Sequence, residues 1–362
     1  MRHREQRLDD LVIVGHVGFA TDRTVNGSVS YVGGSGFVVA FAASALLDSV
    51  GLAAQVGEDF DLDVLRRLPI DMEGIAVQPG ASARLRVDQA SDGTISFGSE
   101  LGVAAEPGFD RYPAAYLHAR YVHLGTAPPR QQLAWLKYLR DRGCHAQVSV
   151  DMFEPFVAAE PGACHEVCDR ADLIFLNEGE HRDLYGGRAD PPTPAVLKHG
   201  PGGAEFLADG VRHRIPAPPV SEVDPIGAGE ILAGSFLALR ARGLAADQAL
   251  TYAVAAATRS VTEFGVPGPA VTGELKRVRD ELGSAFLVRD VPVGGLGRVA
   301  EFDGVAEFGG AAPGGDQAAF GPEFLSPGPP QRGQPAGQAE LPGQLPVATG
   351  SLGRELFGGA HG

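Results

Sequence analysis

The chain has 362 residues, of which 44% are hydrophobic, and this is enough to bury at least one large core in one or two domains. Its formal net charge of -15 at pH 7 disfavours nucleic acid or an anionic membrane as a partner, because phosphate-rich surfaces attract basic proteins. Three cysteines are too few for a disulfide framework, and the first apolar run, "LVIVG", is too short for a signal peptide or a membrane span. We therefore expect a cytoplasmic protein that acts on small molecules.

Strand-like and helix-like runs alternate from the start of the chain. Residues 11–17 are an apolar run typical of a buried strand, 36–51 form a helical stretch that stops at glycine, and 52–57 read as a second strand. Further strands, each after a helical stretch, are "YVHLG", "AQVSVDM" and "DLIFLN". This βαβ order predicts an α/β fold with a mainly parallel sheet that is flanked by helices.

Residues 83–100 ("ARLRVDQASDGTISFGSE") break this pattern, because they read as two strands around the turn "SDGT" with no helix between them. We expect this hairpin to form a small lid over the main sheet. Its exposed edges also offer a way for two chains to pair as a homodimer. The face that needs a cover alternates through Leu85, Val87, Ile95 and Phe97.

The composition changes sharply near residue 291. Residues 291–362 are rich in Gly, Pro, Gln and Ala and show no sustained helical or strand period. Such a segment cannot bury enough apolar area to offset the entropy lost on ordering. We predict one folded domain over residues 1–290 and a disordered tail over residues 291–362.

Four stretches fall at the carboxyl ends of predicted strands, where parallel sheets bind their ligands. They are "GGSG" (33–36), "DMFE" (151–154), "NEGE" (177–180) and "DPIGAGE" (224–230). Each alone is a weak signal, because glycine-rich turns are common in α/β proteins. In this order they are much more specific.

On these motifs, residues 11–270 resemble the PfkB family of ribokinase-like carbohydrate kinases. "DPIGAGE" matches the family signature D-[TP]-x-G-A-G-D except at its last position, and "LNEGE" resembles the family motif N-x-x-E. "VLKHGPGGAEF" resembles the strand and glycine turn that follow, and "GGSGFVVAFAASALLDSVGLAAQVGEDF" the amino-terminal signature. The resemblance implies a three-layer fold with a small β lid, and Mg²⁺-dependent transfer of the γ-phosphoryl group of ATP to a sugar or nucleoside hydroxyl.

The resemblance places the chemistry at the start of the helix that follows "DPI". The backbone N–H groups of Gly227, Ala228 and Gly229 are expected to form an anion hole there, because the helix dipole and free donors both favour negative charge. Glu230 stands where the family has Asp, and it would take the proton from the attacking hydroxyl. A second interpretation stays open, in which Glu230 is only a favourable acidic residue in the first turn of the helix.

Further residues are expected around the nucleotide. Asn177 and Glu180 should lie near the phosphates and Mg²⁺, with Glu180 acting on the metal through water, because Mg²⁺ keeps most of its hydration shell. Asn177 also fits a helix cap. Lys198, Gly200 and Asp224 are expected to contact the nucleotide, although "KHG" fits a solvated turn equally well.

The side that binds the phosphoryl acceptor departs most from the family pattern. The Asn that the family usually places after the double glycine is missing, because Gly33 and Gly34 are followed by Ser35 and later by Phe37. Asp22 is the candidate for the family's acceptor-binding Asp, but its spacing is looser. Phe37 and Val38 in place of an amide favour an acceptor with an apolar or aromatic part, such as a nucleoside, and both fit helix core positions equally well.

Two other functions stay open. The changed carboxylate and acceptor pocket also fit removal of phosphate from a phosphorylated sugar or nucleotide, and the same fold can serve non-catalytic ligand binding.

A metal site at Cys164 and Cys168 is disfavoured, because no second pair supplies the remaining ligands. A dinucleotide site is disfavoured too, because "GGSG" lacks the G-x-G-x-x-G spacing.

Overall fold

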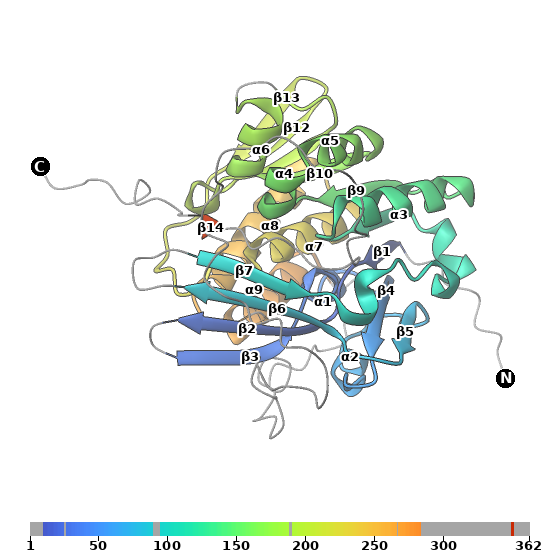
Figure 1. Ribbon diagram of the computed structural model, residues 1–362. Coiled ribbons are helices and arrows are strands. Elements are labelled where there is room, and N and C mark those ends of the chain that lie inside the picture. Colours follow the sequence, from blue (N-terminus) through green and yellow to red (C-terminus); the bar gives the residue numbers. More distant parts are fainter. Residues whose placement is uncertain are drawn as a thin grey trace, which may run out of the picture.

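The computed structural model describes residues 10–24, 27–89, 95–187, 190–265, 267–283 and 349–350. Within them the chain forms a large sheet covered by helices and a smaller sheet beside it (Figure 1). None of the helices in these ranges is both long and apolar enough to cross a membrane.

The larger sheet is mainly parallel. Its strands in the described residues are β1 (Leu11–Val14), β4 (Val50–Gly57), β5 (Ile75–Gln78), β8 (Tyr121–Leu124), β9 (Gln147–Asp151), β10 (Leu173–Asn177), β11 (Ala195–Lys198), β12 (Ala204–Ala208) and β13 (Val211–Ile215). Their order is β13-β12-β11-β10-β9-β8-β1-β4-β5, and all neighbours from β11 to β5 run parallel. Only β12 and β13 continue the sheet antiparallel. The predicted βαβ order is confirmed.

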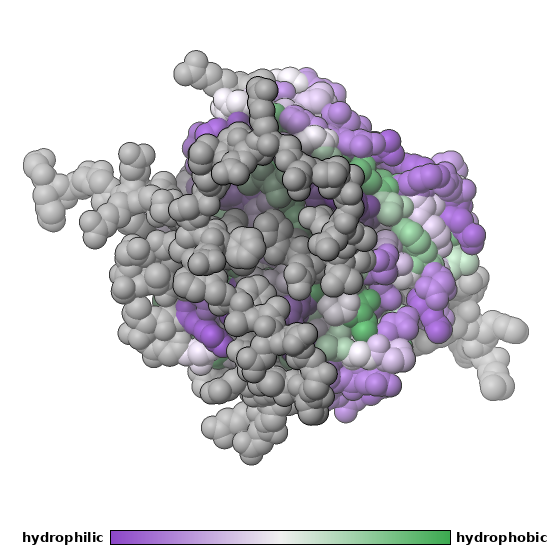
Figure 2. Space-filling model, viewed as in Figure 1, coloured by the Kyte–Doolittle hydropathy of each residue, from purple (hydrophilic) through white to green (hydrophobic). Residues whose placement is uncertain are grey.

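Helices lie on both faces of this sheet and complete a three-layer fold (Figure 1). They are α1 (Ser35–Ser44), α2 (Asp63–Arg66), α3 (Pro129–Asp141), α4 (Glu154–Ala159), α5 (Pro161–Arg170), α6 (Glu178–Tyr185), α7 (Ala228–Ala241), α8 (Ala246–Ser260) and α9 (Pro269–Glu281). Short 3-10 turns lie at Gly102–Ala105, Phe109–Arg111, Ala114–His118 and Gly200–Gly202. One core lies beneath α1, α7, α8 and α9, and a second beneath α3, α5 and α6. The outer side of α3 is hydrophilic (Figure 2).

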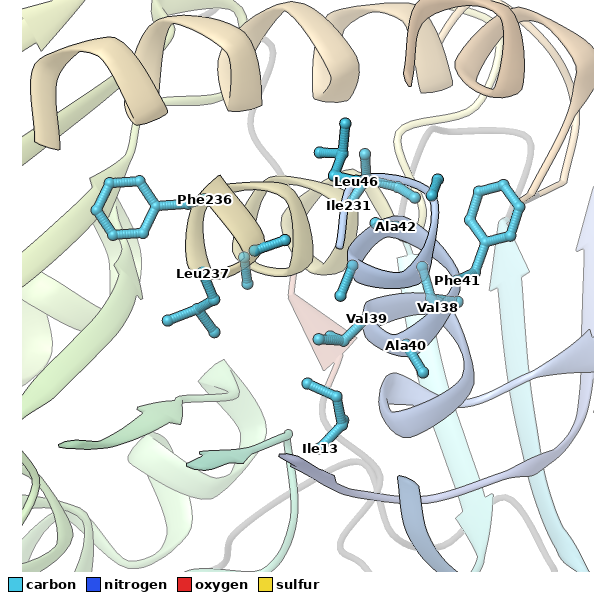
Figure 3. Close-up of a cluster of buried hydrophobic side chains, with 14 of the residues drawn as sticks. Ile13, Val38, Val39, Ala40, Phe41, Ala42, Leu46, Ile231, Phe236 and Leu237 are labelled. Atoms are coloured by element: carbon cyan, nitrogen blue, oxygen red, sulfur yellow. The ribbon is translucent and has the colours of Figure 1, made fainter. Parts of the chain in front are cut away.

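Strand β1 shows why its sequence is a continuous apolar run. Leu11 and Ile13 face the core of α1 and α7, whereas Val12 and Val14 face the opposite core. A central parallel strand is covered on both sides, so every position must be apolar. Figure 3 shows Ile13 beneath α1 and α7, close to Val39 and Leu237.

The smaller sheet forms the lid. It consists of β2 (Gly18–Thr24), β3 (Gly27–Gly33), β6 (Ala83–Gln89), β7 (Ile95–Glu100) and β14 (Thr349–Gly350), in the order β14-β7-β6-β2-β3. The predicted hairpin is present as β6 and β7, paired antiparallel. Strands β2 and β3 were not predicted, and they enlarge the lid because β2 pairs parallel with β6 and antiparallel with β3.

The lid joins the main domain where backbones pass very close to each other. A Cβ atom at Gly18 would lie 2.0 Å from the carbonyl oxygen of Ala83, and one at Gly102 would lie 2.1 Å from that of Ala81. Gly102 also has a φ of 53°, in the left-handed region that favours glycine. These glycines therefore allow the backbones at the base of the lid to pack directly against each other.

Most of the predicted tail lies outside the described residues. Of residues 291–362, only Thr349–Gly350 are described, and they pair antiparallel with Ile95 and Ser96 of β7. The division of the chain at residue 290 stays a prediction.

Candidate active site

A cavity of about 340 Å³ lies between the lid and the carboxyl edge of the main sheet. Its floor comes from strand ends, its sides from the N-termini of α1 and α7, and its roof from lid strands β2, β3, β6 and β7. We call this space the active-site cavity. It lies at the edge where ligands of parallel sheets are expected.

The floor of the cavity consists of residues at or just after the carboxyl ends of five neighbouring strands. His16 follows β1, Thr126 follows β8, and Asp151, Asn177 and Lys198 end β9, β10 and β11. These strands are adjacent in the sheet, so four strand spacings separate His16 from Lys198. At about 4.8 Å a spacing, the floor is about 19 Å long, which suits an extended ligand with two chemically different ends.

The predicted anion hole forms one wall of this cavity. Gly227 caps α7 with a φ of 80°, and both Gly227 and Gly229 line the cavity. Ala228 is not among the described lining residues, and its N–H donates to the carbonyl of Pro225 at 3.3 Å. The first turn of an α-helix leaves N–H groups without helical partners, so this wall presents donors to an anion.

Asp224 supports that wall from behind. Its two carboxylate oxygens accept the N–H groups of Ile226 and Gly265, each at 3.0 Å. Asp224 is buried and is not among the described residues that line the cavity. The structure therefore gives it the role of holding the "DPIGAG" loop in shape.

A buried ion pair lies beside the helix terminus. The Lys198 ammonium is 2.6 Å from Asp151 Oδ1, with side-chain exposures of 17% and 2% respectively. Burial alone would lower the pKa of Lys198, but the carboxylates of Asp151, Glu180 and Glu230 outweigh it and raise that pKa above its ordinary value. A Cβ atom at Gly229 would be 3.3 Å from the Lys198 ammonium, so a cation stands next to the predicted anion hole.

Glu230 lies in the first turn of α7 and lines the same cavity. Burial, and then repulsion from Asp151, raise the pKa of Glu230 above its ordinary value, while Lys198 opposes them. A carboxylate with a raised pKa binds a proton more strongly, so it is a better base once it is ionised.

Asn177 and Glu180 form a capping box at the start of α6. The Glu180 N–H donates to Asn177 Oδ1 at 2.8 Å. In return, the backbone N–H of Asn177 donates to Glu180 Oε2 at 2.7 Å, and Asn177 Nδ2 donates to Glu180 Oε1 at 3.0 Å. Burial, opposed by Lys198, raises the pKa of Glu180 to about 7. Each oxygen of Glu180 thus accepts one hydrogen bond from Asn177, which fixes the orientation of the carboxylate.

The carboxylates around this cavity suit a hard cation. Asp151, Glu180 and Glu230 all line it and offer the oxygen ligands that Mg²⁺ prefers. In the part of the chain that the structure describes, no group of three or more His, Cys, Asp or Glu side chains is placed to hold a metal ion. The donor set therefore fits an ion that arrives with phosphate groups and keeps most of its water. Cys164 and Cys168 are buried free thiols away from it.

The glycines at the start of α1 form the opposite end of the cavity, where Gly33, Gly34 and Ser35 all contribute to the lining. Gly34 has a φ of 101°, and a Cβ atom there would be 2.4 Å from the carbonyl oxygen of His16. The Ser35 hydroxyl donates to the carbonyl of Thr126 at 3.3 Å. Glycine thus lets α1 begin directly against the end of β1.

Besides Ala228 and Asp224, three further predicted residues lie away from the cavity lining. Phe37 is fully buried in the core of α1 and α7, which corresponds to its interpretation as a helix core residue. Gly200 opens a 3-10 turn after β11, with open space around its α-carbon. Asp22 is buried on lid strand β2, where it accepts the Tyr31 hydroxyl at 2.7 Å and burial raises its pKa to about 6. Tyr31, not Asp22, lines the cavity.

The apolar walls of the cavity come from the lid hairpin and from the segment that follows β9. Leu85, Val87 and Phe97 of the lid face the cavity opposite Phe153 and Phe156, which follow β9. The rings of Phe97 and Phe153 are 5.5 Å apart at 80°, an edge-to-face contact between the lid and the main domain. Leu85, Val87 and Phe97 belong to the alternating apolar face of the hairpin for which the sequence predicts a cover, whereas Phe156 carried no such signal.

The cavity thus brings together helix N–H donors, the Lys198 ammonium and the Glu230 carboxylate, a set of groups that suits transfer of an anionic group to a hydroxyl. The fold and the cavity thus define a small-molecule kinase of the three-layer α/β class. Residues 10–272 match the pfkB family carbohydrate kinases, and the chain therefore belongs to this family.

Individual relatives agree with this assignment. The chain is 29% identical over 276 residues to a cytidine kinase of Thermococcus kodakarensis, covering 71% of this chain and 97% of that one. It is 29% identical over 234 residues to an ATP-dependent ribose-1-phosphate kinase of Halopiger xanaduensis, covering 61% of this chain and 77% of that one. The fold matches the crystal structure of ribokinase from Cryptococcus neoformans var. grubii serotype A in complex with ADP, with a TM-score of 0.63 and 18% sequence identity. The match covers 76% of this chain and 99% of the ribokinase chain. The ribokinase-like fold is confirmed.

Proposed function

We propose that this protein transfers the γ-phosphoryl group of ATP, in the presence of Mg²⁺, to a hydroxyl of a nucleoside. The observation that carries the proposal is the position of Glu230. Its carboxylate lies in the same cavity as the glycine-lined start of α7 and the Lys198 ammonium. A proton acceptor and a site for a transferred anion are thus side by side, as phosphoryl transfer to a hydroxyl requires.

The reaction balances with the groups in the cavity. Glu230 takes the proton of the substrate hydroxyl, whose oxygen forms the new bond to the γ-phosphorus. The bond between that phosphorus and the bridging oxygen breaks, and ADP leaves with the electron pair. The N–H groups in the first turn of α7 and the Lys198 ammonium hold the oxygens of the phosphoryl group in flight. Mg²⁺, held through water near Glu180 and Asp151, would neutralise phosphate charge.

The walls of the cavity favour a nucleoside over a small free sugar. Phe97 and Phe153 cover its middle with aromatic surface, and Leu85 and Val87 add apolar surface from the lid. A flat nucleobase gains from such surfaces, whereas a free sugar would leave them in contact with polar groups. The name of the Thermococcus kodakarensis relative, a cytidine kinase, supports the same substrate class.

A cytoplasmic location is part of the proposal, since the three cysteines are free thiols, which persist in a reducing compartment.

The test is a substrate screen with the full chain. Nucleosides, free sugars and sugar phosphates are each incubated with ATP and Mg²⁺, and ADP and inorganic phosphate are measured separately. Release of ADP in step with a phosphorylated nucleoside is the expected result. Release of phosphate from a phosphorylated compound without ATP would instead indicate a phosphatase, and absence of both products would indicate a binding protein. Omission of Mg²⁺ should abolish ADP release.

A further inference from the structure

One partner holds the Lys198 ammonium in the active-site cavity. Lys198 Nζ donates to Asp151 Oδ1 at 2.6 Å, and among the residues that the structure describes Asp151 is the only one that forms a hydrogen bond or an ion pair with this ammonium. An ammonium carries three N–H groups. Two of them therefore remain for the oxygens of a ligand in the cavity, which Lys198 lines.

The end of the Lys198 side chain runs along the first turn of α7. A Cβ atom on Gly229 would lie 3.3 Å from Lys198 Nζ and 3.6 Å from Lys198 Cδ, so the missing side chain at Gly229 leaves the ammonium its room. Gly229 belongs to the cavity wall that presents backbone N–H donors. The ammonium thus adds a full positive charge to a helix terminus that alone supplies about half a charge.

Asp151 is itself fixed through its backbone. It ends β9, and its side chain is only 2% exposed. The Nε2 of buried Gln132 on α3 donates to the carbonyl oxygen of Asp151 at 2.9 Å and to that of Gly125 at 3.1 Å. Because Gly125 directly follows β8, helix α3 ties the ends of two neighbouring strands together. The Asp151 carboxylate therefore has a defined position from which to hold Lys198.

Two other carboxylates would compete for the ammonium if Asp151 did not hold it. Glu180 and Glu230 line the same cavity, and both attract the Lys198 charge. Glu230 is the proton acceptor of the proposed reaction. An ammonium that paired with Glu230 would occupy this acceptor and would leave its place beside Gly229.

We propose that Asp151 is a positioning residue of the phosphoryl transfer, which holds the Lys198 ammonium beside Gly229 and apart from Glu230. The inference rests on the proposed function, because it takes the phosphoryl group to be transferred at the start of α7. Asp151 acts through Lys198, so loss of Asp151 slows the reaction only while Lys198 is present.

A double-mutant cycle tests whether the two residues act as one unit. Asp151→Leu keeps a branched side chain of similar shape and removes both the charge and the acceptor. A reacting group displaced by about 1 Å costs about 10² in rate, so we expect kcat at saturating nucleoside, ATP and Mg²⁺ to fall by about tenfold to a hundredfold. Added to Lys198→Met, the same change should alter kcat by less than about twofold.

Two results of this cycle would overturn the proposal. One is a loss in Asp151→Leu that multiplies with the loss in Lys198→Met, since Asp151 would then act independently of the ammonium. The other is a loss that appears at limiting Mg²⁺ and disappears at saturating Mg²⁺, since Asp151 would then serve the metal. Asp141→Leu is the matched control, because it removes the carboxylate partner of exposed Lys137 away from the cavity lining. We expect it to leave kcat unchanged.

The position of the ammonium can be determined without turnover. In a crystal structure of Asp151→Leu, we expect Lys198 Nζ to have left Gly229 and to pair with Glu180 or Glu230. An ammonium that keeps its place beside Gly229 would overturn the proposal, and this result also decides it if Lys198→Met alone does not fold. A wild-type protein that phosphorylates no nucleoside would refute the proposed function, whereas the crystal structure judges Asp151 separately.

Discussion

Replacement of Glu230 by Gln removes the proton acceptor of the proposed reaction and keeps the shape of the side chain. The anion site uses backbone N–H groups at Gly227 and Gly229 and the Lys198 ammonium, none of which is changed. We therefore expect the affinity for ATP to stay within about twofold, while kcat falls by about 10² to 10⁴, the usual contribution of a general base.

The pH dependence adds a second signature of the base. Burial and Asp151 raise the pKa of Glu230, so its carboxylate gains a proton at a higher pH than an exposed Glu would. The wild-type kcat should fall as the pH is lowered through that raised pKa, because only the ionised form accepts a proton. The residual activity of Glu230→Gln should lack this limb of the profile.

Glu230→Asp tests whether the cavity is formed around the longer side chain. The family signature has Asp at this position, but the Lys198–Asp151 pair and the start of α7 set the present geometry. A carboxylate displaced by about 1 Å costs about 10² in rate, and we expect kcat to fall by that factor. A rise in kcat would show that the longer side chain is only tolerated.

The assay is steady-state ADP release with saturating nucleoside, ATP and Mg²⁺, and Glu166→Gln is the matched control. Glu166 is an exposed carboxylate on α5 that pairs with Arg170 and is not among the described residues lining the cavity, so its loss should leave kcat unchanged. If Glu230→Gln turned over substrate as fast as the control, Glu230 would be only a favourable charge in the first turn of α7.

Four further outcomes follow from the same geometry. Lys198→Met should raise the KM for ATP and lower kcat, and leave buried Asp151 unpaired, so thermal denaturation should also show a lower Tm. Phe97→Ala should raise the KM for the nucleoside more than that for ATP, since it removes apolar wall at the lid. Burial raises the pKa of Asp22 to about 6. The stability that protonated Asp22 contributes is therefore present below its unfolded pKa and is lost as the pH rises through about 6. Between pH 5 and pH 8, the Tm of Asp22→Asn should fall less than the Tm of the wild type. Deletion of residues 291–362 should shift Tm by only a few degrees, and a large fall would show that the tail packs on the domain.

The layered fold could be predicted because the apolar runs in the sequence indicate which strands are buried. Leu11, Val12, Ile13 and Val14 are all apolar because both faces of β1 are covered. Strands β2 and β3 escaped prediction, because they are half-exposed and mix small, polar and apolar residues directly after β1. The Asn26-Gly27 dipeptide between them is a hairpin signal that could have indicated the second half of the lid.

The site could be predicted only in part. The glycines of the start of α7 and the Asn177–Glu180 box are local in sequence, so their positions followed from motifs. The Lys198–Asp151 pair joins residues 47 apart, and only the strand order brings them together. Phe37 was ambiguous for another reason. Every residue of α1 is buried, so the helix has no polar face. Its sequence pattern therefore does not indicate which side of the helix faces a cavity and which side faces the core.

The charges in the cavity connect the acidic sequence to the proposed chemistry. Lys198 is surrounded by the carboxylates of Asp151, Glu180 and Glu230, so the neighbourhood of the anion hole is negative before any phosphate enters. A bare triphosphate would be repelled by these groups, and the helix terminus alone offers only about half a unit of positive charge. A nucleotide that carries Mg²⁺ removes the conflict, since its charge is partly neutralised and the same carboxylates then attract the hydrated ion.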